Sequence, residues 1–397
     1  MPNALRPLRD AELSMRQFEQ RAAALPPVLR SRRELEAHGI RFLPEDAQAA
    51  VQLPIADDGT TFSMAQDVRW LDTDHFAVGR WDGSLDVFRY TPTRSSGPLI
   101  RTAVSSPSAI GVQMITRLSA NSFVSSNDSQ SMVVWSRSVG RDWSEIRPDG
   151  TLRYDAEFGV ATGGDSFAVG GHHYLVVGHA SGFLTVWSSP ATTTPLRFVV
   201  AVDLQSAAPV NPFGLQHIHD VYLVYAEHSS ALVVTASENG QLCFVRIPDG
   251  KIMSRTVFND AARRGINSIA VRDRDLLVAN CSVGSSDYNL WYFRMDVDAA
   301  NIALRDRVDL KVNPHRPQAF NFCVVWARTD DGPCWFSSTE EGALWMGTAD
   351  SAQGLSVIGY QEATNPLGSV LAFQPCGRLV MIGFNLYEFV TLNSPPA

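Results

Sequence analysis

A pair of histidines near the middle of the chain has the spacing of metal ligands. His217 and His219 stand two apart and Asp220 follows, so on a strand the two imidazoles would share one face. A third ligand at a useful spacing is missing, because His228 falls on the other side of a strand. We therefore predict no metal site here and no cofactor for the chain.

A second group of histidines lies earlier in the chain, at His172, His173 and His179. No Cys-x-x-Cys or His-Glu-x-x-His motif accompanies them, so their spacing does not indicate a metal-binding helix or knuckle. We predict that these histidines are loop residues with ordinary solvent contact.

Glycine pairs at 163–164 and 170–171 raise the question of a nucleophile or a phosphate site. Ser166 follows the first pair, but the Gly-x-Ser-x-Gly elbow of a serine hydrolase is absent. Neither pair precedes Lys-Ser, Lys-Thr or the start of a helix, as a phosphate-binding loop would. We interpret both pairs as turns between strands and predict no catalytic residue from them.

The strongest candidates for binding are turns that carry acidic residues and one tryptophan. These turns are predicted to join the second and third strands of successive repeats, and so to open on one face of the fold. The candidate partner-binding residues are Arg80, Trp81, Asp82, Asp128, His179, Glu238, Asp287, Glu340 and Glu341. An exposed tryptophan is typical of an interface anchor, and six carboxylates on one face suit a basic peptide or an Arg-rich surface. The alternative is that the turns are simply polar and Trp81 folds back on its own repeat.

The elements that must position these turns repeat along the chain. A four-residue pattern follows a turn in each repeat: a long aliphatic residue, any residue, then two mostly bulky ones. Its copies begin at Leu85, Met132, Leu184, Leu242, Leu290, Leu344 and Leu386. The first residues stand 47, 52, 58, 48, 54 and 42 apart, and a period near 40–50 residues with short strands is typical of a β-propeller. One repeat cannot bury its own apolar faces, so the copies must stack into a closed ring with these leucines buried.

Two hairpins resemble the second and third strands of a WD40 repeat, Ala77–Phe88 and Val176–Trp187. In the fourth repeat, His217 with Val221 and Val224 is similar to the family's Gly-His start. The resemblance covers about residues 50–392, although most repeats lack the Gly-His pair and the closing Trp-Asp is absent. It implies an all-β, WD40-like propeller, which the repeat count makes seven-bladed, and a structural hydrogen-bonding role for His217.

The two ends of the chain are predicted to differ from the repeats. Residues 1–40 are expected to form a pair of helices interrupted at Pro26-Pro27, packed against the propeller or, alternatively, docked on another chain. Residues 41–397 are expected to form the propeller. Its last blade has only three strands of its own, so residues 51–55 are predicted to supply the fourth and remove an exposed edge.

Composition limits the possible partners and compartment. The 397 residues are 45% hydrophobic with a net charge of −8, which disfavours nucleic acid and anionic membranes as partners. No stretch approaches the roughly 18 apolar residues of a membrane span, and charges near the N-terminus argue against a secretory signal. The five cysteines form no Cys-x-x-Cys pair. We expect buried free thiols in the cytoplasm, with a Cys323–Cys334 bond as the alternative.

These observations favour a non-enzymatic scaffold or adaptor that binds a protein partner, of basic or Arg-rich character, on the turn face around Trp81. The alternative is a propeller enzyme, a hydrolase or lyase, with its site in the central channel. A third hypothesis is a substrate-selecting adaptor in a protein-modification or defence complex. Its only support is that the chain has two lysines, Lys251 and Lys311. The sequence does not indicate the oligomeric state.

Overall fold

The protein is described from a computed structural model, in which nearly all regular structure is β-strand. The structure describes residues 40–42, 63–89, 100–105, 111–190, 195–206, 215–257, 265–283, 288–311, 318–329, 332–340, 343–362, 370–374, 378–382 and 386–391. Within these ranges, the helical segments are two short 3-10 turns, η3 (Trp143–Glu145) and η4 (Ala156–Phe158). The predicted helical pair at residues 1–40 lies outside the described residues, apart from Ile40.

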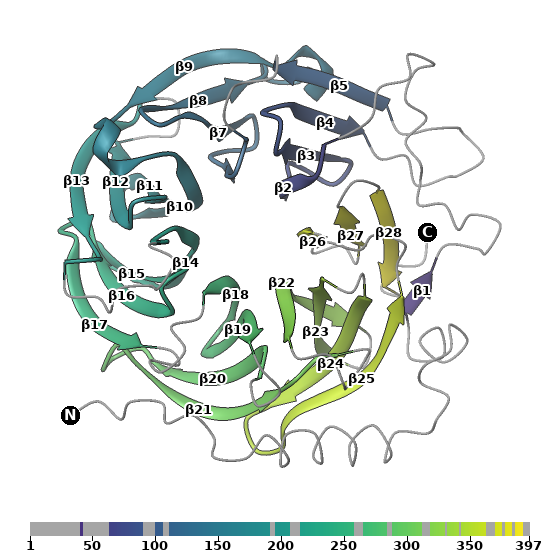
Figure 1. The fold of residues 1–397 in the computed structure, drawn as a ribbon. Helices are drawn as coiled ribbons and strands as arrows, with labels where there is room; N and C mark the ends of the chain where they lie inside the picture. The colour runs from purple at the N-terminus through teal and green to yellow at the C-terminus, as the bar shows by residue number, and fades with distance from the viewer. Residues whose placement is uncertain are drawn as a thin grey trace.

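Antiparallel four-stranded sheets stand radially around a central axis (Figure 1). The first sheet holds β2 (Ala65–Trp70), β3 (His75–Arg80), β4 (Leu85–Arg89) and β5 (Ile100–Ser105). The second holds β6 (Ile115–Arg117), β7 (Ser122–Asp128), β8 (Ser131–Ser136) and β9 (Arg147–Arg153). The third holds β10 (Ala161–Val169), β11 (His172–His179), β12 (Phe183–Ser189) and β13 (Arg197–Asp203). The fourth holds β14 (Ile218–Glu227), β15 (Ser230–Ser237), β16 (Gln241–Ile247) and β17 (Lys251–Val257).

The remaining strands form one large sheet and one small one. The large sheet joins β18 (Ile266–Arg272), β19 (Asp275–Val283), β20 (Leu290–Asp296) and β21 (Asn301–Val308) to β22 (Gln318–Thr329), β23 (Gly332–Thr339), β24 (Ala343–Asp350) and β25 (Gly354–Glu362). The small sheet holds β26 (Val370–Gln374), β27 (Arg378–Ile382), β28 (Leu386–Thr391) and β1 (Ile40–Phe42). In each set the earliest strand lies nearest the axis, except that β1 lies outermost (Figure 1).

The number of separate blades differs from the prediction. The described strands form six hydrogen-bonded sheets, not seven, because one sheet has eight strands. Within it, β19 reaches across to β22 through the residue pairs Cys281↔Phe320, Ser282↔Ala319 and Val283↔Gln318. The all-β propeller is confirmed, whereas the expectation of seven separate four-stranded sheets is corrected by this pairing.

The strand beside β28 also differs from the one that we expected. Ile40 pairs with Thr391 and Phe42 with Phe389, so β1 occupies the outer edge of the small sheet. The segment predicted for this place, residues 51–55, lies outside the described residues. The edge of β28 is therefore covered by Ile40–Phe42.

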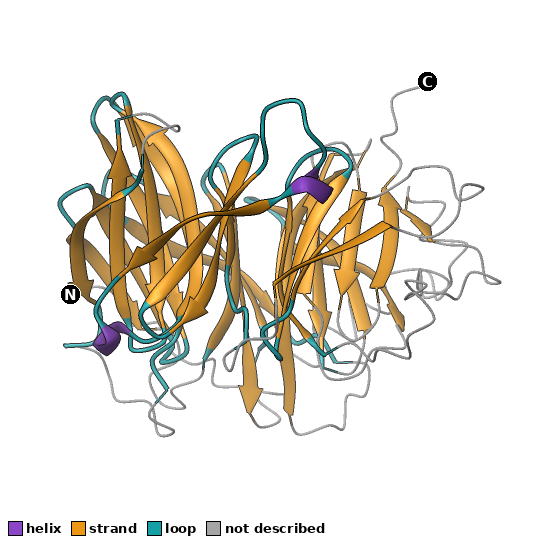
Figure 2. Ribbon diagram, turned by 90° about the horizontal axis from the view of Figure 1, so that it is seen from above, coloured by secondary structure: helices purple, strands orange, loops and turns teal. Residues whose placement is uncertain are grey.

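The apolar pattern forms the interfaces between adjacent sheets, as predicted. Leu85, Leu184, Leu242, Leu290 and Leu344 are all at most 3% exposed. Leu184 of β12, for example, packs in one cluster with Val233 of β15 and Val245 of β16, which belong to the following sheet. Figure 2 shows these sheets from the side, standing next to one another around the ring. Stacking of neighbouring repeats, rather than a core inside any one of them, thus supplies the buried apolar surface.

The cysteines that the structure describes with side chains are free thiols. Cys243 and Cys334 are buried and Cys323 is half-buried. Cys323 pairs with Ser338, and Cys334 with Ala327, so the alternative of a Cys323–Cys334 bond is not realised. Burial raises the pKa of Cys323 to about 11 and that of Cys334 to about 12, which keeps both as neutral thiols.

Candidate functional site

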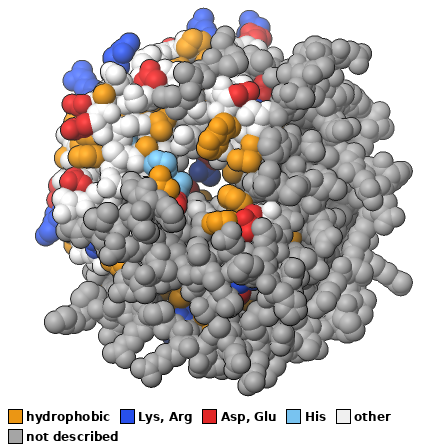
Figure 3. Space-filling model, in the orientation of Figure 1, with side chains coloured by type: hydrophobic (Ala, Val, Ile, Leu, Met, Phe, Trp, Pro, Cys, Tyr) orange, Lys and Arg blue, Asp and Glu red, His pale blue; other side chains and the backbone are white. Residues whose placement is uncertain are grey.

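The channel along the axis of the ring contains a cavity of about 340 Å³. Its walls come from β2, β10, β14, β18, β22 and β26, together with Gln113 just before β6 and the turn that carries Trp81. Figure 3 looks onto the open end of this channel, where histidine, acidic and hydrophobic side chains surround the opening. A site here is built from residues that are up to about 300 positions apart in sequence, from Gln66 to Leu371.

Bulges in the innermost strands bring side chains, four of the five polar, to the wall of the cavity. The antiparallel register shifts by one residue in each of β2, β10, β14, β18 and β22, which leaves one residue without a partner on the neighbouring strand. The unpaired residues are Gln66, Thr162, His219, Asn267 and Phe322, and every one of them lines the cavity. The bulges therefore create a ring of side chains that a regular strand would direct elsewhere.

The residue after each bulge ties its sheet to the next inner strand. A carboxylate, hydroxyl or thiol accepts a hydrogen bond from a backbone N–H across the channel wall. The pairs are Asp67 Oδ2 with Ile115 N at 2.7 Å, Asp220 Oδ2 with Ile269 N at 2.8 Å, Ser268 Oγ with Val324 N at 3.4 Å, and Cys323 Sγ with Leu371 N at 3.4 Å. These bonds satisfy buried backbone donors and fix the width of the channel.

In β10 the residue after the bulge is Gly163, which has no side chain to accept such a hydrogen bond, so this strand is joined to the next in a different way. A Cβ there would lie 2.3 Å from the backbone oxygen of His219, so only glycine allows β10 and β14 to approach so closely. Asp165, two residues further on, accepts from the Leu223 N–H at 2.8 Å. Gly163 and Gly164 thus lie inside β10, which corrects their interpretation as a turn, whereas Gly170 and Gly171 do form one, with φ of 59° and 77°.

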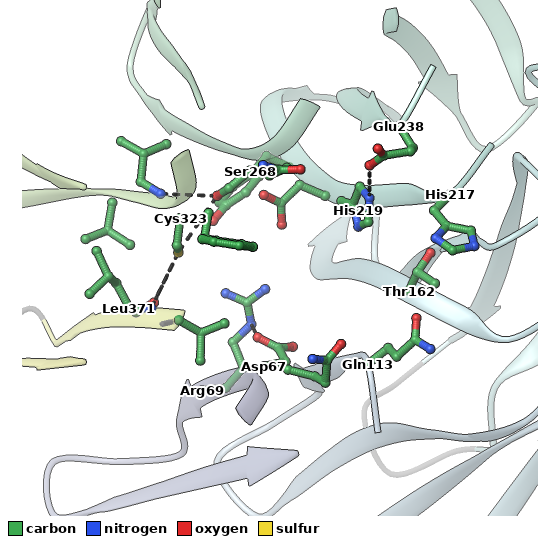
Figure 4. A pocket seen from close by; sticks show the side chains of 18 of the residues that line it. Asp67, Arg69, Gln113, Thr162, His217, His219, Glu238, Ser268, Cys323 and Leu371 are labelled. Atoms are coloured by element: carbon green, nitrogen blue, oxygen red, sulfur yellow. Dashed lines mark hydrogen bonds and ion pairs between the residues drawn. The ribbon is translucent and has the colours of Figure 1, made fainter. Parts of the chain in front are cut away.

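A charged cluster lies deep in the channel around Arg69. Its Nε donates to the backbone oxygen of Ile115 at 3.1 Å and lies 3.6 Å from Asp67 Oδ1 (Figure 4). The carboxylate of Asp67 raises the pKa of Arg69, so the guanidinium stays charged. Burial raises the pKa of Asp220 to about 6 and also raises those of Asp67 and Tyr222. We call Asp67, Arg69, Asp220 and Tyr222 the charged cluster.

The open end of the channel combines an ion pair with exposed apolar surface. His219 Nε2 lies 2.7 Å from Glu238 Oε2, and the rings of His217 and His219 meet edge to face at 5.7 Å (Figure 4). Burial lowers the pKa of His217, and the neighbouring His219 lowers it further. Trp81 is 63% exposed and Leu215 39% exposed at the same opening. We call these five residues the channel mouth.

Of the predicted turn residues that the structure describes, Trp81 and Glu238 are the two that line this cavity. Asp82 is exposed, and its carboxylate accepts from the backbone and hydroxyl of Ser84, which closes the β3–β4 turn. Asp128 ends β7 and accepts from Gln130 N and Ser131 Oγ. Glu340 is half-buried in the turn after β23. Asp287 and Glu341 lie outside the described residues.

Arg80 and His179 are not surface residues, which corrects the prediction that they contact a partner. Both occupy the last position of the second strand of a sheet and are at most 1% exposed. Arg80 Nε binds Asp86 Oδ2 at 3.2 Å, and His179 Nε2 lies 2.8 Å from Thr185 Oγ1, so each ties the second strand to the third. Burial lowers the pKa of His179 to about 4, which keeps the imidazole neutral.

The other histidines have separate positions. His172 is exposed at the start of β11 and His173 is 7% exposed within it, so these residues lie in a strand, not in the predicted loop. His217 and His219 do lie together, as their spacing predicted. The backbone oxygen of His217 accepts from Glu238 N at 2.8 Å, and its side chain lines the cavity. Among the residues that the structure describes, no group of three or more His, Cys, Asp or Glu is placed to hold a metal ion.

Most of the cavity lining could not be identified from the turns. Gln66, Asp67, Arg69 and Tyr222 belong to innermost strands whose apolar neighbours dominate the sequence pattern. The sequence did contain one indication of this site. Asp67 and Arg69 are charged residues inside one of these strands, and a charge that leaves bulk water needs a partner. In the described part of the chain, no helix is long and apolar enough to span a bilayer.

Comparison with known proteins identifies the fold and goes no further. No protein-family model matches the chain, and no curated protein matches it. Among solved structures, the WD40 beta-propeller domain of Doa1 matches with 12% identity and a TM-score of 0.57, over 84% of this chain and 95% of that one. BBS1N in complex with ARL6DN matches with 12% identity and a TM-score of 0.57, over 86% and 95%. The Myceliophteria thermophila Cps50 (Swd1) beta-propeller domain matches with 14% identity and a TM-score of 0.52, over 84% and 98%. The fold is therefore that of a WD40 β-propeller.

Proposed function

We propose that the protein is a non-enzymatic interaction scaffold of the cytoplasm that binds a protein partner across the channel mouth. The observation that carries this proposal is Trp81, which is 63% exposed at the rim of a cavity. A large indole left in solvent is typical of an interface anchor, because burying it on binding supplies much of the free energy. Leu215 extends this apolar surface at the same opening.

The charge around the mouth favours a basic partner. Glu238 lies at the opening and Asp82 is exposed beside Trp81, while the chain carries a net charge of −8. Carboxylates at the edge of an interface mainly attract and orient an oppositely charged partner. Among proteins of this fold, BBS1N has been solved in complex with ARL6DN, which supports a protein partner for the propeller.

We also propose that the ring contains seven four-stranded units. The eight-stranded sheet divides into two runs of four antiparallel strands, β18 to β21 and β22 to β25, joined through three residue pairs at the end of β19. The repeat period of the sequence supports this division, because one copy of the apolar pattern begins at Leu290 and another at Leu344.

The test begins with affinity capture of partners from the native host, followed by binding measurements with the purified partner. Trp81→Ala should weaken binding by at least about 2 kcal/mol and change the thermal unfolding temperature little. Phe198→Ala is the matched control, since Phe198 is 48% exposed on the outer strand β13, away from the channel. Charge reversal at Glu340 and Glu341 should slow association at low salt, with a smaller effect as salt rises.

Unchanged affinity in Trp81→Ala would refute the proposed site. Equal loss in Trp81→Ala and Phe198→Ala would also contradict it, because the outer surface of the ring would then be the interface.

A further inference from the structure

Hydrogen-bond donors inside the channel point into the cavity. The Nε of Arg69 is used by Ile115, but no described residue accepts a hydrogen bond from its two terminal nitrogens. Figure 4 shows the guanidinium of Arg69 directed into the cavity beside Asp67. Tyr222 lines the same cavity, and its hydroxyl likewise has no hydrogen-bond partner among the described residues. Arg69 pairs with Ala77 and Tyr222 with Val234, in corresponding places on β2 and β14, and both residues line the cavity.

The charges around these donors disfavour an ionic ligand. Arg69 Nε lies 3.6 Å from the half-buried Asp67, and its guanidinium also interacts electrostatically with the buried Asp220; all three line the cavity. An anion on the guanidinium would meet both carboxylates, each of which already accepts a hydrogen bond from a backbone N–H through its Oδ2. A cation at the same depth would meet Arg69 itself. An uncharged group that accepts and donates hydrogen bonds carries neither penalty.

Two side-chain amides supply the matching polar groups, one from the bulge residue Gln66 and one from Gln113, which precedes β6. The side-chain amides of Gln66 and Gln113 line the cavity, and neither forms a hydrogen bond with a described residue. A side-chain amide donates hydrogen bonds through its nitrogen and accepts them through its oxygen, and a hydroxyl can do both. One amide can therefore bind two neighbouring hydroxyls of a ligand, accepting from one and donating to the other. At the mouth, Trp81 offers an exposed aromatic face.

We propose that the channel binds an uncharged, polyhydroxylated small molecule such as a monosaccharide or a cyclic polyol. Arg69 and Tyr222 hold its inner hydroxyls, Gln66 and Gln113 its outer ones, and Trp81 covers its apolar face. The cavity, at about 340 Å³, is within the range of small-molecule sites, roughly 300–1,000 Å³. This site goes beyond the proposed scaffold function and does not depend on a protein partner.

The test is calorimetric titration of the full chain with glucose, mannose, galactose and myo-inositol, each up to tens of millimolar. At least one should bind saturably at one site per chain. For a sugar that binds, the 6-carboxylate and the 6-amino analogues should bind at least about 10-fold more weakly. The added carboxylate would be repelled by Asp67 and Asp220, and the added ammonium by Arg69.

Two substitutions locate the site. Tyr222→Phe removes one hydroxyl and should lower the affinity about 5- to 10-fold. Tyr225→Phe is the matched control, since Tyr225 lies on the same strand, is 43% exposed and does not line the cavity, and it should leave the affinity unchanged. Arg69→Met should abolish measurable binding. If Arg69→Met does not fold, the two tyrosine variants, checked by thermal unfolding, still decide the question.

Failure of all four neutral compounds to saturate would mean that the channel holds water only, and would overturn the proposal. Tighter binding of a charged analogue, or an affinity unaffected by Tyr222→Phe, would overturn it as well. Both proposals would be supported if Trp81→Ala loses binding of the protein partner and Tyr225→Phe still binds the sugar saturably. Sugar binding without any effect of Trp81→Ala on a partner would remove the scaffold proposal alone.

Discussion

The interfaces between neighbouring sheets and the wall of the channel follow opposite rules. At the interfaces, corresponding positions carry nearly the same residue, as in Leu85, Leu184, Leu242, Leu290 and Leu344, and all are buried. Along the channel, corresponding bulge positions carry Gln66, Thr162, His219, Asn267 and Phe322. The repeat therefore builds the ring, and the places where repeats disagree show where the molecule has acquired individual chemistry.

The two regions also differ in what each costs in free energy. The interfaces bury apolar side chains, which is favourable at every copy. The channel wall instead holds charged groups away from bulk water, the half-buried Arg69 and Asp67 and the buried Asp220, and each needs partners to offset its desolvation. Asp67 and Asp220 obtain these partners from backbone N–H groups of the next inner strand. Charge in the channel thus also joins neighbouring sheets.

The largest expected effect lies in the interfaces. Leu242→Ala should lower the free energy of unfolding by about 2–5 kcal/mol, because it leaves a cavity against Ile269 and Phe293 of the following sheet. Chemical denaturation of both proteins measures this difference. Met253→Ala, at a 40% exposed position on β17, is the control and should change stability by less than about 0.5 kcal/mol. Similar losses in both variants would mean that the interfaces are not the core.

A smaller effect is expected at the closest approach of two inner strands. Gly163→Ala should cost about 1–3 kcal/mol, since the new methyl group would lie 2.3 Å from the backbone oxygen of His219 and push β14 away. Ala168→Ser on the exposed part of the same strand is the control. Equal stabilities of Gly163→Ala and the wild type would show that β10 and β14 can move apart at little cost. The channel wall would then be less tightly packed than the strand contact at Gly163 indicates.

The smallest effect concerns the charge of Asp220 and depends on pH. Burial raises its pKa in the folded protein to about 6, above that of an unfolded aspartate, so the folded state binds the proton more tightly. The stability that Asp220 contributes is therefore present at about pH 4 and is lost as pH rises through 6. Asp220→Asn removes this dependence and keeps an acceptor for Ile269 N.

Between pH 4.5 and 7.5, the stability of Asp220→Asn relative to wild type should rise by on the order of 1–2 kcal/mol. Denaturation midpoints across this pH range provide the measurement. Parallel pH curves for the two proteins would show that Asp220 is not desolvated in the channel.

Much of the ring could be predicted because its repeat is apolar and regular. The three strands that the last repeat was predicted to supply correspond to β26, β27 and β28. The pairing of β19 with β22 could not be predicted, because it depends on backbone contacts between residues such as Cys281 and Phe320 and has no side-chain periodicity.

The site was harder to predict for two physical reasons. A bulge adds one residue to a strand, so the two-residue alternation that separates inside from outside shifts at Gln66 and His219. In addition, Arg80 and His179, which were predicted to lie in turns, are the last residues of the strands β3 and β11. This position keeps both side chains buried, whereas Trp81, the next residue after β3, is exposed.

The pairing of β1 with β28 has a consequence for how the protein is made. Ile40 is synthesised some 350 residues before its partner Thr391, so the small sheet cannot be completed until almost all of the described chain has left the ribosome. The earlier sheets contain only strands that follow one another closely and can form while synthesis continues. Residues 40–42 therefore remain without their partner strand while the strands between them are synthesised, and the ring closes only when β28 becomes available. A chain released inside the final repeat would leave the small sheet incomplete and the ring open.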